Sequence, residues 1–155
     1  MKFRFIPELI DVDISANNHQ EAIQRLGNLM VTQGCVHADY VDLVWKREQE
    51  YPTGLHTRGA NIAMPHAFDE RNTESHVALG ILNTPVEFHD MEDTEEWLPV
   101  RILFMLAVGK AHEQLEMLQI LMQIFKEEQL LKDIVQMKSR ESICDKLNSY
   151  VENLS

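Results

Sequence analysis

The sequence has no long run of apolar residues. The longest, VRILFMLAVG from Val100 to Gly109, contains Arg101 and has about half of the roughly 20 residues that a membrane-spanning helix needs. The opening MKFRFIPELI carries two basic residues, but Pro7 and Glu8 interrupt it before an apolar stretch of signal-peptide length can form. We therefore expect a cytoplasmic protein with no direct membrane insertion.

Basic residues and cysteines are scarce. Lys and Arg number 14 against 25 Asp and Glu, a formal net charge of −11. Such a surface repels nucleic acid and favours encounter with a basic protein partner. The two cysteines, Cys35 and Cys144, are far apart and form no CxxC motif. They are predicted to be reduced thiols that pack as small hydrophobic residues.

Motifs of common catalytic and cofactor sites are missing. There is no GxSxG and no GxxxxGK[ST], so ATP is not expected as a direct substrate and no cofactor is predicted. The acidic stretch DMEDTEEWLP lacks the alternating ligands and central glycine of a calcium loop. The seven histidines show no HExxH or HxH spacing, so a metal site would require tertiary folding to bring together His56, His66, His76 and His112.

Two amphipathic helices are predicted in the first third of the chain. In SANNHQEAIQRLGNLMVTQG, Ser15 or Asn17 is the expected N-cap and Gly34 the terminator. One face of this helix is apolar and consists of Ala22, Ile23, Leu26, Leu29 and Met30. ADYVDLVWKREQE predicts a second helix that ends at about Glu50, before the turn YPTG.

Strands are predicted in the middle of the chain and helices again at its end. The strongest strand patterns are His76–Leu82 and Arg101–Val108, and NTPVEFHD between them indicates a turn and a short edge strand. HEQLEMLQILMQIFKEEQLLKDIV predicts one long helix, and SRESICDKLNSYV a last helix capped by Ser139. The long helix has two apolar faces, one with Leu115, Leu118, Met122 and Phe125 and a wider one with Met117, Ile120, Leu121 and Ile124.

The length of 155 residues and a hydrophobic content of 45% are sufficient for one core without disulfides or metal. Helices at both ends with strands between them predict an α/β fold. We expect a single layered domain over residues 1–155, with a mixed β-sheet of four or five strands flanked by helices.

The stretch NIAMPHAFDE places His66 directly after a proline. Proline fixes φ and lacks an N–H donor, so the strand is expected to stop at Met64 and His66 to project from a stiff loop. Imidazole titrates near neutral pH and is a good nucleophile. A second histidine, His112, opens a helix after a strong strand, where unpaired N–H groups and the helix dipole favour an anion such as a phosphoryl group.

Five segments in the order KREQEYPTGL, NIAMPHA, PVEF, VRILFMLAV and AHEQLEMLQILMQIF resemble the IIA components of the bacterial phosphoenolpyruvate-dependent sugar phosphotransferase system (PTS), in the fructose/mannitol superfamily. The similarity covers nearly the whole chain. PTGL, PVEF and LEMLQ are most similar to the galactitol-type branch. The resemblance implies the type-2, mannitol IIA-like fold.

The resemblance also implies three site residues. IAMPH is similar to the family motif AIPH, whose histidine carries the phosphoryl group, which makes His66 the phosphohistidine nucleophile. The family's arginine ahead of the TG turn corresponds to Arg47, six residues before Thr53, for phosphoryl stabilisation. His112 takes the role of the second histidine as a phosphoryl hydrogen-bond donor. Two features depart from the family pattern: LHTRGANIAMP is longer than the usual loop, and many members have the second histidine where this chain has Gln114.

The implied protein is a phosphotransferase component, not an ATP-dependent kinase. It takes a phosphoryl group from phospho-HPr, a small carrier protein, on His66 and passes it to a cysteine of the cognate IIB protein. It thereby serves the membrane IIC component during uptake of a sugar or polyol such as galactitol. Because attack needs a neutral imidazole, Nδ1 of His66 is expected to donate to a backbone carbonyl or carboxylate and leave Nε2 unprotonated.

Alternatives remain open for the function and for two of the residues. IIA-like domains also serve as phosphorylation-dependent regulatory modules. Fusion of the domain to an output domain would favour this regulatory role. A histidine-cluster metal hydrolase would be indicated by stoichiometric zinc. Arg47 can instead be a solvated charge at a helix end, and His112 a helix cap.

Overall fold

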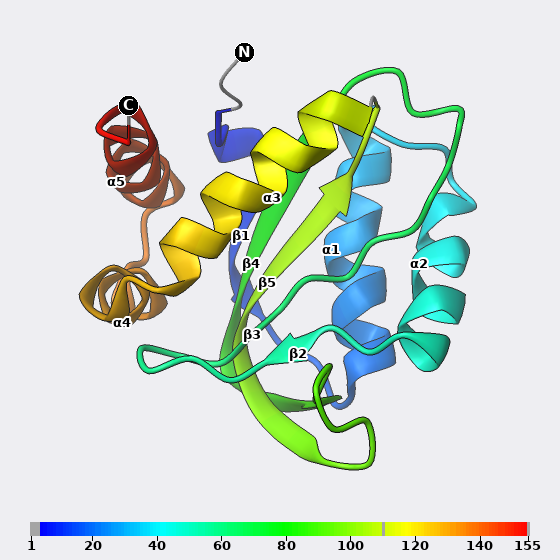
Figure 1. The fold of residues 1–155 in the computed structure, drawn as a ribbon, viewed down its shortest axis with the longest axis horizontal. Helices are drawn as coiled ribbons and strands as arrows, with labels where there is room; N and C mark the ends of the chain where they lie inside the picture. Colours follow the sequence, from blue (N-terminus) through cyan, green and yellow to red (C-terminus); the bar gives the residue numbers. More distant parts are fainter. Residues whose placement is uncertain (1–3, 110, 155) are drawn as a thin grey trace.

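A mixed five-stranded sheet forms the middle layer of the molecule (Figure 1). The structure, a computed structural model, describes residues 4–109 and 111–154. For residues 111 and 112 it describes the backbone but not the side chains. The strand order is β1-β4-β5-β3-β2, with bounds Ile10–Ile14, His76–His89, Trp97–Ala107, Ile62–Ala63 and Gly54–Leu55. The β1–β4 and β3–β5 pairs are parallel, and the β4–β5 and β2–β3 pairs are antiparallel. The predicted mixed sheet is therefore confirmed.

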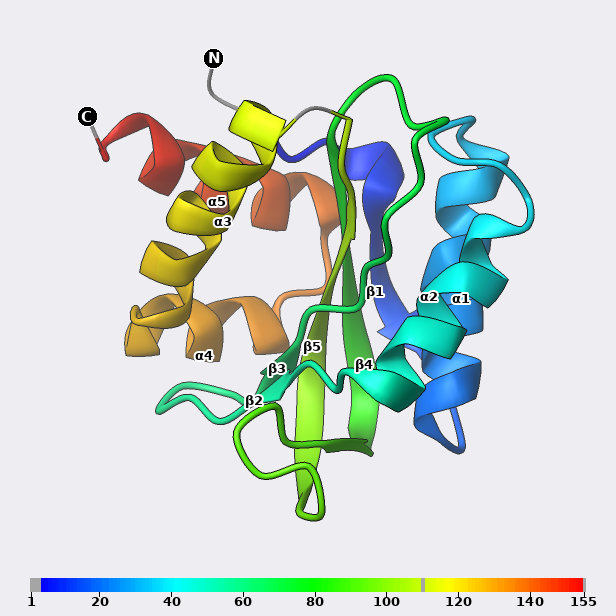
Figure 2. The same cartoon turned by 45° about the vertical axis from the view of Figure 1, so that its right-hand side comes forward.

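Helices cover both faces of this sheet, as Figures 1 and 2 show from two directions. One face carries α1 (His19–Thr32) and α2 (Tyr40–Glu50). The other carries α3, α4 and α5, whose bounds are Ala111–Phe125, Glu128–Gln136 and Arg140–Glu152, and the short 3-10 helix η1 (Pro7–Leu9) precedes β1. The predicted layered α/β domain is thus confirmed.

The central strands divide their apolar side chains between the two layers, because successive residues of a strand point to opposite faces. On β5, Ile102, Phe104 and Leu106 belong to the core beneath α3, α4 and α5. The intervening Leu103 and Met105 belong to the core beneath α1 and α2. Both faces of the strand are buried from Ile102 to Ala107, which explains why this part of its sequence is a continuous apolar run.

Side-chain caps fix the starts of two helices. Ser139 caps α5 as predicted, because its hydroxyl accepts from Ser142 N. The cap of α1 is Asn18, whose side chain accepts from Glu21 N at 2.9 Å, so the prediction of Ser15 or Asn17 was wrong. After α1 the chain turns at Gly34, whose φ of +77° is a conformation that glycine adopts readily.

The prediction of a turn and an edge strand in NTPVEFHD was wrong. β4 runs on to His89 and pairs with β5 along both of its halves. The ladder shifts register between Ile81 and Val86. Pro85 lies inside that irregular stretch, where a missing N–H donor is tolerated. The turn-forming residues therefore produce an irregularity in the strand and do not end it.

The single long helix predicted after Ala111 is two helices. The chain turns at Lys126 and Glu127, whose N–H groups donate to carbonyls three residues earlier. The segment contains neither glycine nor proline, so the break follows from packing. It lets Leu131 and Ile134 of α4 enter the same core as α3. The β2–β3 loop fits closely against this break, since a Cβ on Gly59 would lie 2.6 Å from the Glu128 carbonyl oxygen.

Only one of the two predicted apolar faces of α3 is fully inward. Met117, Leu121 and Ile124 of the wider face are buried. On the other face, Leu115 is 60% exposed and Met122 is 39% exposed. Phe125 of this second face is buried and Leu118 is half-buried, so the second face meets solvent only in part.

Candidate functional site

His66 lies on a segment whose backbone is fixed against the sheet. β3 ends at Ala63, one residue before the predicted end, because Met64 N donates to Thr53 Oγ1 at 3.1 Å. Pro65 has no N–H, and its carbonyl accepts from Leu106 N at 3.1 Å. His66 itself forms an isolated bridge with Leu106 of β5. The stiff loop predicted for His66 is therefore held by the last residues of a central strand.

The imidazole of His66 makes one hydrogen bond that determines its tautomer. Nδ1 lies 2.8 Å from the carbonyl oxygen of Met64, and the side chain is half-buried. A carbonyl can only accept, so Nδ1 carries the proton and the neutral ring has its lone pair on Nε2. This is the arrangement expected for a nucleophilic histidine.

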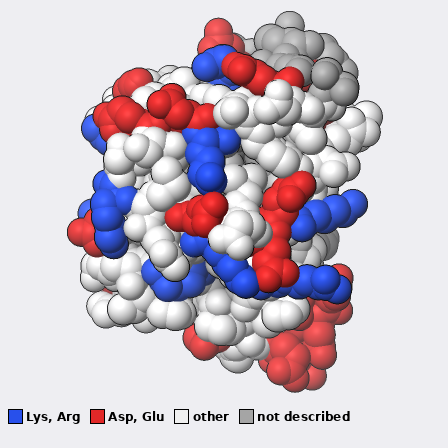
Figure 3. Space-filling model, turned by 90° about the vertical axis from the view of Figure 1, so that its left-hand side faces the viewer, with Lys and Arg blue, Asp and Glu red and all other residues white. Residues whose placement is uncertain are grey.

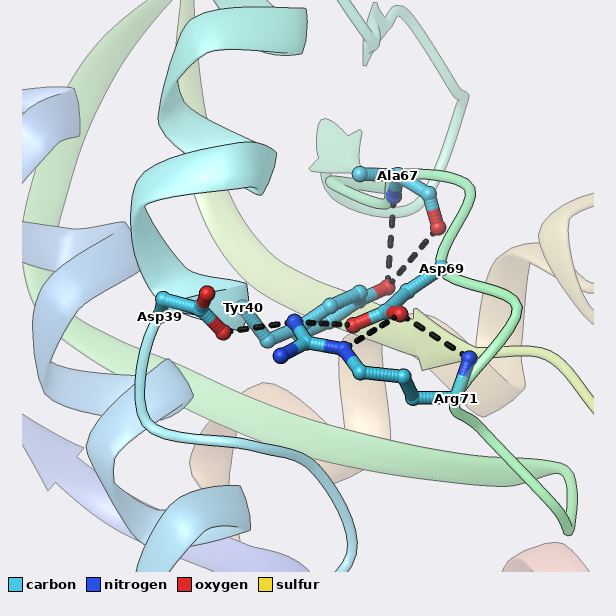
Figure 4. Close-up of polar contacts among 5 residues, drawn as sticks. All are labelled: Asp39, Tyr40, Ala67, Asp69 and Arg71. Atoms are coloured by element: carbon cyan, nitrogen blue, oxygen red, sulfur yellow. Dashed lines mark hydrogen bonds and ion pairs between the residues drawn. The ribbon is translucent and has the colours of Figure 1, made fainter.

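Tyr40 connects α2 to the His66 segment and to β5, and Figure 4 shows its contacts with Ala67. Its hydroxyl oxygen lies 2.5 Å from the Leu106 carbonyl oxygen and 3.2 Å from that of Ala67, and it accepts from Ala67 N at 3.2 Å. The ring is fully buried, and burial raises the pKa of Tyr40 to about 12. The neutral hydroxyl thus joins the first residue of α2 to the residue after His66.

An ion-pair cluster holds the loop that follows (Figure 4). Arg71 Nε and one terminal nitrogen each donate to Asp69 at 2.9 Å, and that terminal nitrogen also donates to Asp39 Oδ1 at 2.6 Å. The hydrogen bond from Arg71 lowers the pKa of the buried Asp69 carboxyl below its ordinary value. Between His66 and this cluster lies Phe68, whose side chain is 84% exposed. The loop is therefore anchored while it presents an apolar ring to solvent.

A second buried carboxyl group lies beneath the site. Glu48 is 3% exposed and accepts from Thr53 N at 2.8 Å and from Thr53 Oγ1 at 2.7 Å. Burial raises the pKa of Glu48 to about 7, although both bonds from Thr53 act in the opposite direction. This residue was not predicted from the sequence. A signal was present, because Glu48 occupies the buried face of α2 together with Tyr40 and Val44.

Arg47 lies in the last turn of α2 and contacts Tyr51. Its guanidinium carbon is 4.5 Å from the centroid of the Tyr51 ring. Among the described contacts, no hydrogen bond or ion pair joins Arg47 to His66. A cation–π contact at an exposed ring contributes only about 0.5–1 kcal/mol, so a bound anion can compete for this side chain. Tyr51 is 58% exposed.

His112 belongs to the first turn of α3, and its side chain lies outside the described part of the structure. Because α3 begins at Ala111, His112 is the second residue of the helix. β5 ends at Ala107, one residue after the partner of His66. The backbone therefore places His112 at the same end of the sheet as His66.

The described residues also bear on other kinds of site. Over residues 4–109 and 113–154, no group of three or more His, Cys, Asp or Glu side chains is placed to hold a metal ion. No helix in the described part of the chain is long and apolar enough to cross a membrane. Cys35 and Cys144 are free thiols, as predicted.

Comparison with known proteins assigns the chain to a family. Residues 5–150 match the family model of the phosphoenolpyruvate-dependent sugar phosphotransferase system, EIIA 2. The mannitol-specific phosphotransferase enzyme IIA component of Staphylococcus aureus is 32% identical over 140 residues, 90% of this chain and 91% of that protein. Its counterpart from Halalkalibacterium halodurans is 29% identical over 139 residues, 88% of each chain. The protein belongs to the EIIA type-2 family of this phosphotransferase system.

A solved structure shares the fold. Enzyme IIA-Mtl of Escherichia coli, in a complex with phosphorylated enzyme IIB-Mtl, superposes with a TM-score of 0.77 at 22% identity. The match covers 96% of this chain and 99% of the other. The five-stranded sheet and its helical layers are therefore those of the mannitol IIA-like fold.

Proposed function

We propose that the protein is a phosphoryl carrier that accepts a phosphoryl group from phospho-HPr on Nε2 of His66 and passes it to a cysteine of a cognate IIB protein. The observation that carries this proposal is the bond from His66 Nδ1 to the Met64 carbonyl, which leaves the Nε2 lone pair free. Nε2 bonds to phosphorus as the nitrogen–phosphorus bond of phospho-HPr breaks. The cysteine thiolate then displaces Nε2, and the proton on Nδ1 stays in place throughout.

The surroundings of His66 support transfer between two proteins. Phosphoryl transfer needs positioning and charge stabilisation more than covalent chemistry. We assign stabilisation of the phosphoryl oxygens to Arg47, once it leaves Tyr51, and to His112 at the start of α3. The exposed ring of Phe68, two residues from His66, is an apolar contact for a docking partner. The motifs PTGL, PVEF and LEMLQ support a galactitol-like polyol system as the one that the protein serves through IIB and IIC.

The test is phosphorylation by phosphoenolpyruvate, enzyme I and HPr. We expect one phosphoryl group on the wild-type protein, stable in base and labile in acid, and none on His66→Ala. His56→Ala is the matched control, because this exposed imidazole on the β2–β3 loop bonds Asn61 instead. Undiminished labelling of His66→Ala would show that another residue is the acceptor.

A further inference from the structure

A continuous chain of hydrogen bonds connects a buried carboxyl group to His66. Thr53 donates to Glu48 through both its N–H, at 2.8 Å, and its hydroxyl, at 2.7 Å. Met64 N then donates to the same Thr53 hydroxyl at 3.1 Å. The Met64 carbonyl accepts from His66 Nδ1 at 2.8 Å. These four residues are called the Glu48 relay below.

The chemistry of each group gives the relay one direction. The Met64 N–H can only donate, so the Thr53 hydroxyl oxygen accepts from it and directs its single proton to Glu48 Oε1. The lone pairs of that oxygen are then left for Met64 N–H. With its N–H bound in this way, the Met64 backbone is held so that its carbonyl faces Nδ1 of the imidazole. In water the neutral imidazole of histidine prefers its proton on Nε2, so the relay selects the less common tautomer.

Burial shows that the relay is not a surface network. Glu48, Thr53 and Met64 are 3%, 4% and 4% exposed. Among the described ion pairs, none includes Glu48, and both of its hydrogen-bond donors come from Thr53. A buried carboxyl group without a cation is unfavourable, and a hydrophobic residue at this place on α2 would pack at lower cost. The position is therefore better explained by what Glu48 does for the site than by stability.

We propose that Glu48 and Thr53 are positioning residues for His66. The carboxyl group of Glu48 orients the Thr53 hydroxyl, and this hydroxyl fixes the Met64 carbonyl that keeps the proton on Nδ1. Neither residue touches the phosphoryl group. The consequence for phosphoryl transfer rests on the function proposed above, whereas the consequence for the tautomer of His66 does not.

The experiment compares Thr53→Val, Thr53→Ser and Glu48→Gln with the unmodified protein. Valine keeps the shape of threonine and removes the hydroxyl, whereas serine retains it. Asn148→Ala is the matched control, since Asn148 is also buried, 6% exposed, and bonds backbone groups of Phe5 from α5. Two readouts are taken on each protein: the nitrogen-15 chemical shifts of neutral His66 and the single-turnover rate of transfer from phospho-HPr.

We expect Thr53→Val to shift His66 toward the Nε2–H tautomer and to slow transfer by about 10–100-fold, since small misplacement of a reacting group has costs of this order. Glu48→Gln should change both readouts in the same direction. Thr53→Ser should resemble the unmodified protein. Asn148→Ala should lose stability while the His66 shifts and the transfer rate stay unchanged.

Two outcomes would overturn the proposal. One is a Thr53→Val protein that is less stable but has unchanged His66 shifts and rate. If that variant does not fold, the second is a folded Glu48→Gln protein that matches the unmodified one in both readouts. Failure of the unmodified protein to accept a phosphoryl group would instead contradict the proposed function, and the nitrogen shifts would still decide whether the relay sets the tautomer.

Discussion

Glu48 is a carboxyl group in an apolar environment, where the neutral form is favoured. The ordinary pKa of this side chain is 4.5, and burial raises it to about 7 in the folded protein. Between these values the folded state binds a proton that the unfolded chain does not hold. The contribution of Glu48 to stability is therefore fully present below the unfolded pKa and is lost as the pH rises through the folded one.

We predict that Glu48→Gln removes this pH dependence. Relative to the unmodified protein, the variant should gain up to about 3 kcal/mol of unfolding free energy between about pH 4.5 and pH 8, at 1.36 kcal/mol per pKa unit. Urea unfolding at several pH values measures the difference. Glu50→Gln is the control, because it removes the same charge from an exposed position of α2. Equal pH slopes in the two variants would contradict the prediction.

At the scale of elements, one hydroxyl group joins α2, the His66 segment and β5. Tyr40→Phe retains the buried ring but leaves Ala67 N–H without its acceptor and the Leu106 carbonyl without its donor. We predict a loss of about 1–3 kcal/mol of unfolding free energy, the usual cost of unsatisfied buried groups. Hydrogen exchange at the Ala67 amide should become faster.

Tyr51→Phe provides a comparison for this measurement, because Tyr51 is a tyrosine of the same region that is 58% exposed. It should leave both stability and exchange nearly unchanged. If the Ala67 amide of Tyr40→Phe exchanged as slowly as in the unmodified protein, other contacts would hold the His66 segment.

The elements that could be predicted from sequence are those made by local interactions. The face of α1, the end of α2 near Glu50 and the Ser139 cap all depend on residues within a few positions of one another. The break between α3 and α4 has no local cause, since it arises where the β2–β3 loop packs on Glu128. The continuation of β4 likewise depends on its partner strand.

The same limit applied to the site. The motif IAMPH predicted His66 as the nucleophile, and the expected Nδ1 bond to a backbone carbonyl is present. Thr53 looked like part of a turn, because its role depends on Met64, which is 11 residues away. Its other partner, Glu48, could have been noticed as a carboxyl group on an apolar helical face. Arg47 and His112 remain predictions from the family pattern.

At the scale of the molecule, acidic residues outnumber basic ones, 25 to 14. On the side that carries α4 and α5, basic and acidic side chains alternate (Figure 3). Ion pairs such as Lys132–Glu128 and Lys146–Asp133 account for part of this mixture. Over the whole sequence the formal net charge is −11, and a charge of this size affects the encounter with charged partners.

We predict that docking with a basic HPr surface is steered by this charge. Stopped-flow association rates should fall as salt rises from about 0.05 to 0.5 M, where the Debye length shortens several-fold. The dissociation rate, measured on the same complex, should change less. An association rate that does not respond to salt would show that net charge does not steer the encounter.

The pairing of α5 with the start of the chain has a consequence for protein synthesis. Asn148 bonds both the N–H and the carbonyl of Phe5, and the Phe5 ring shares a core with Ile143 and Leu147. A ribosome makes Phe5 143 residues before Asn148 of α5. During translation Phe5 lacks its contacts with α5 until that helix has emerged. The part of this core that packs on α5 therefore stays open in the nascent chain from the synthesis of Phe5 until α5 has emerged.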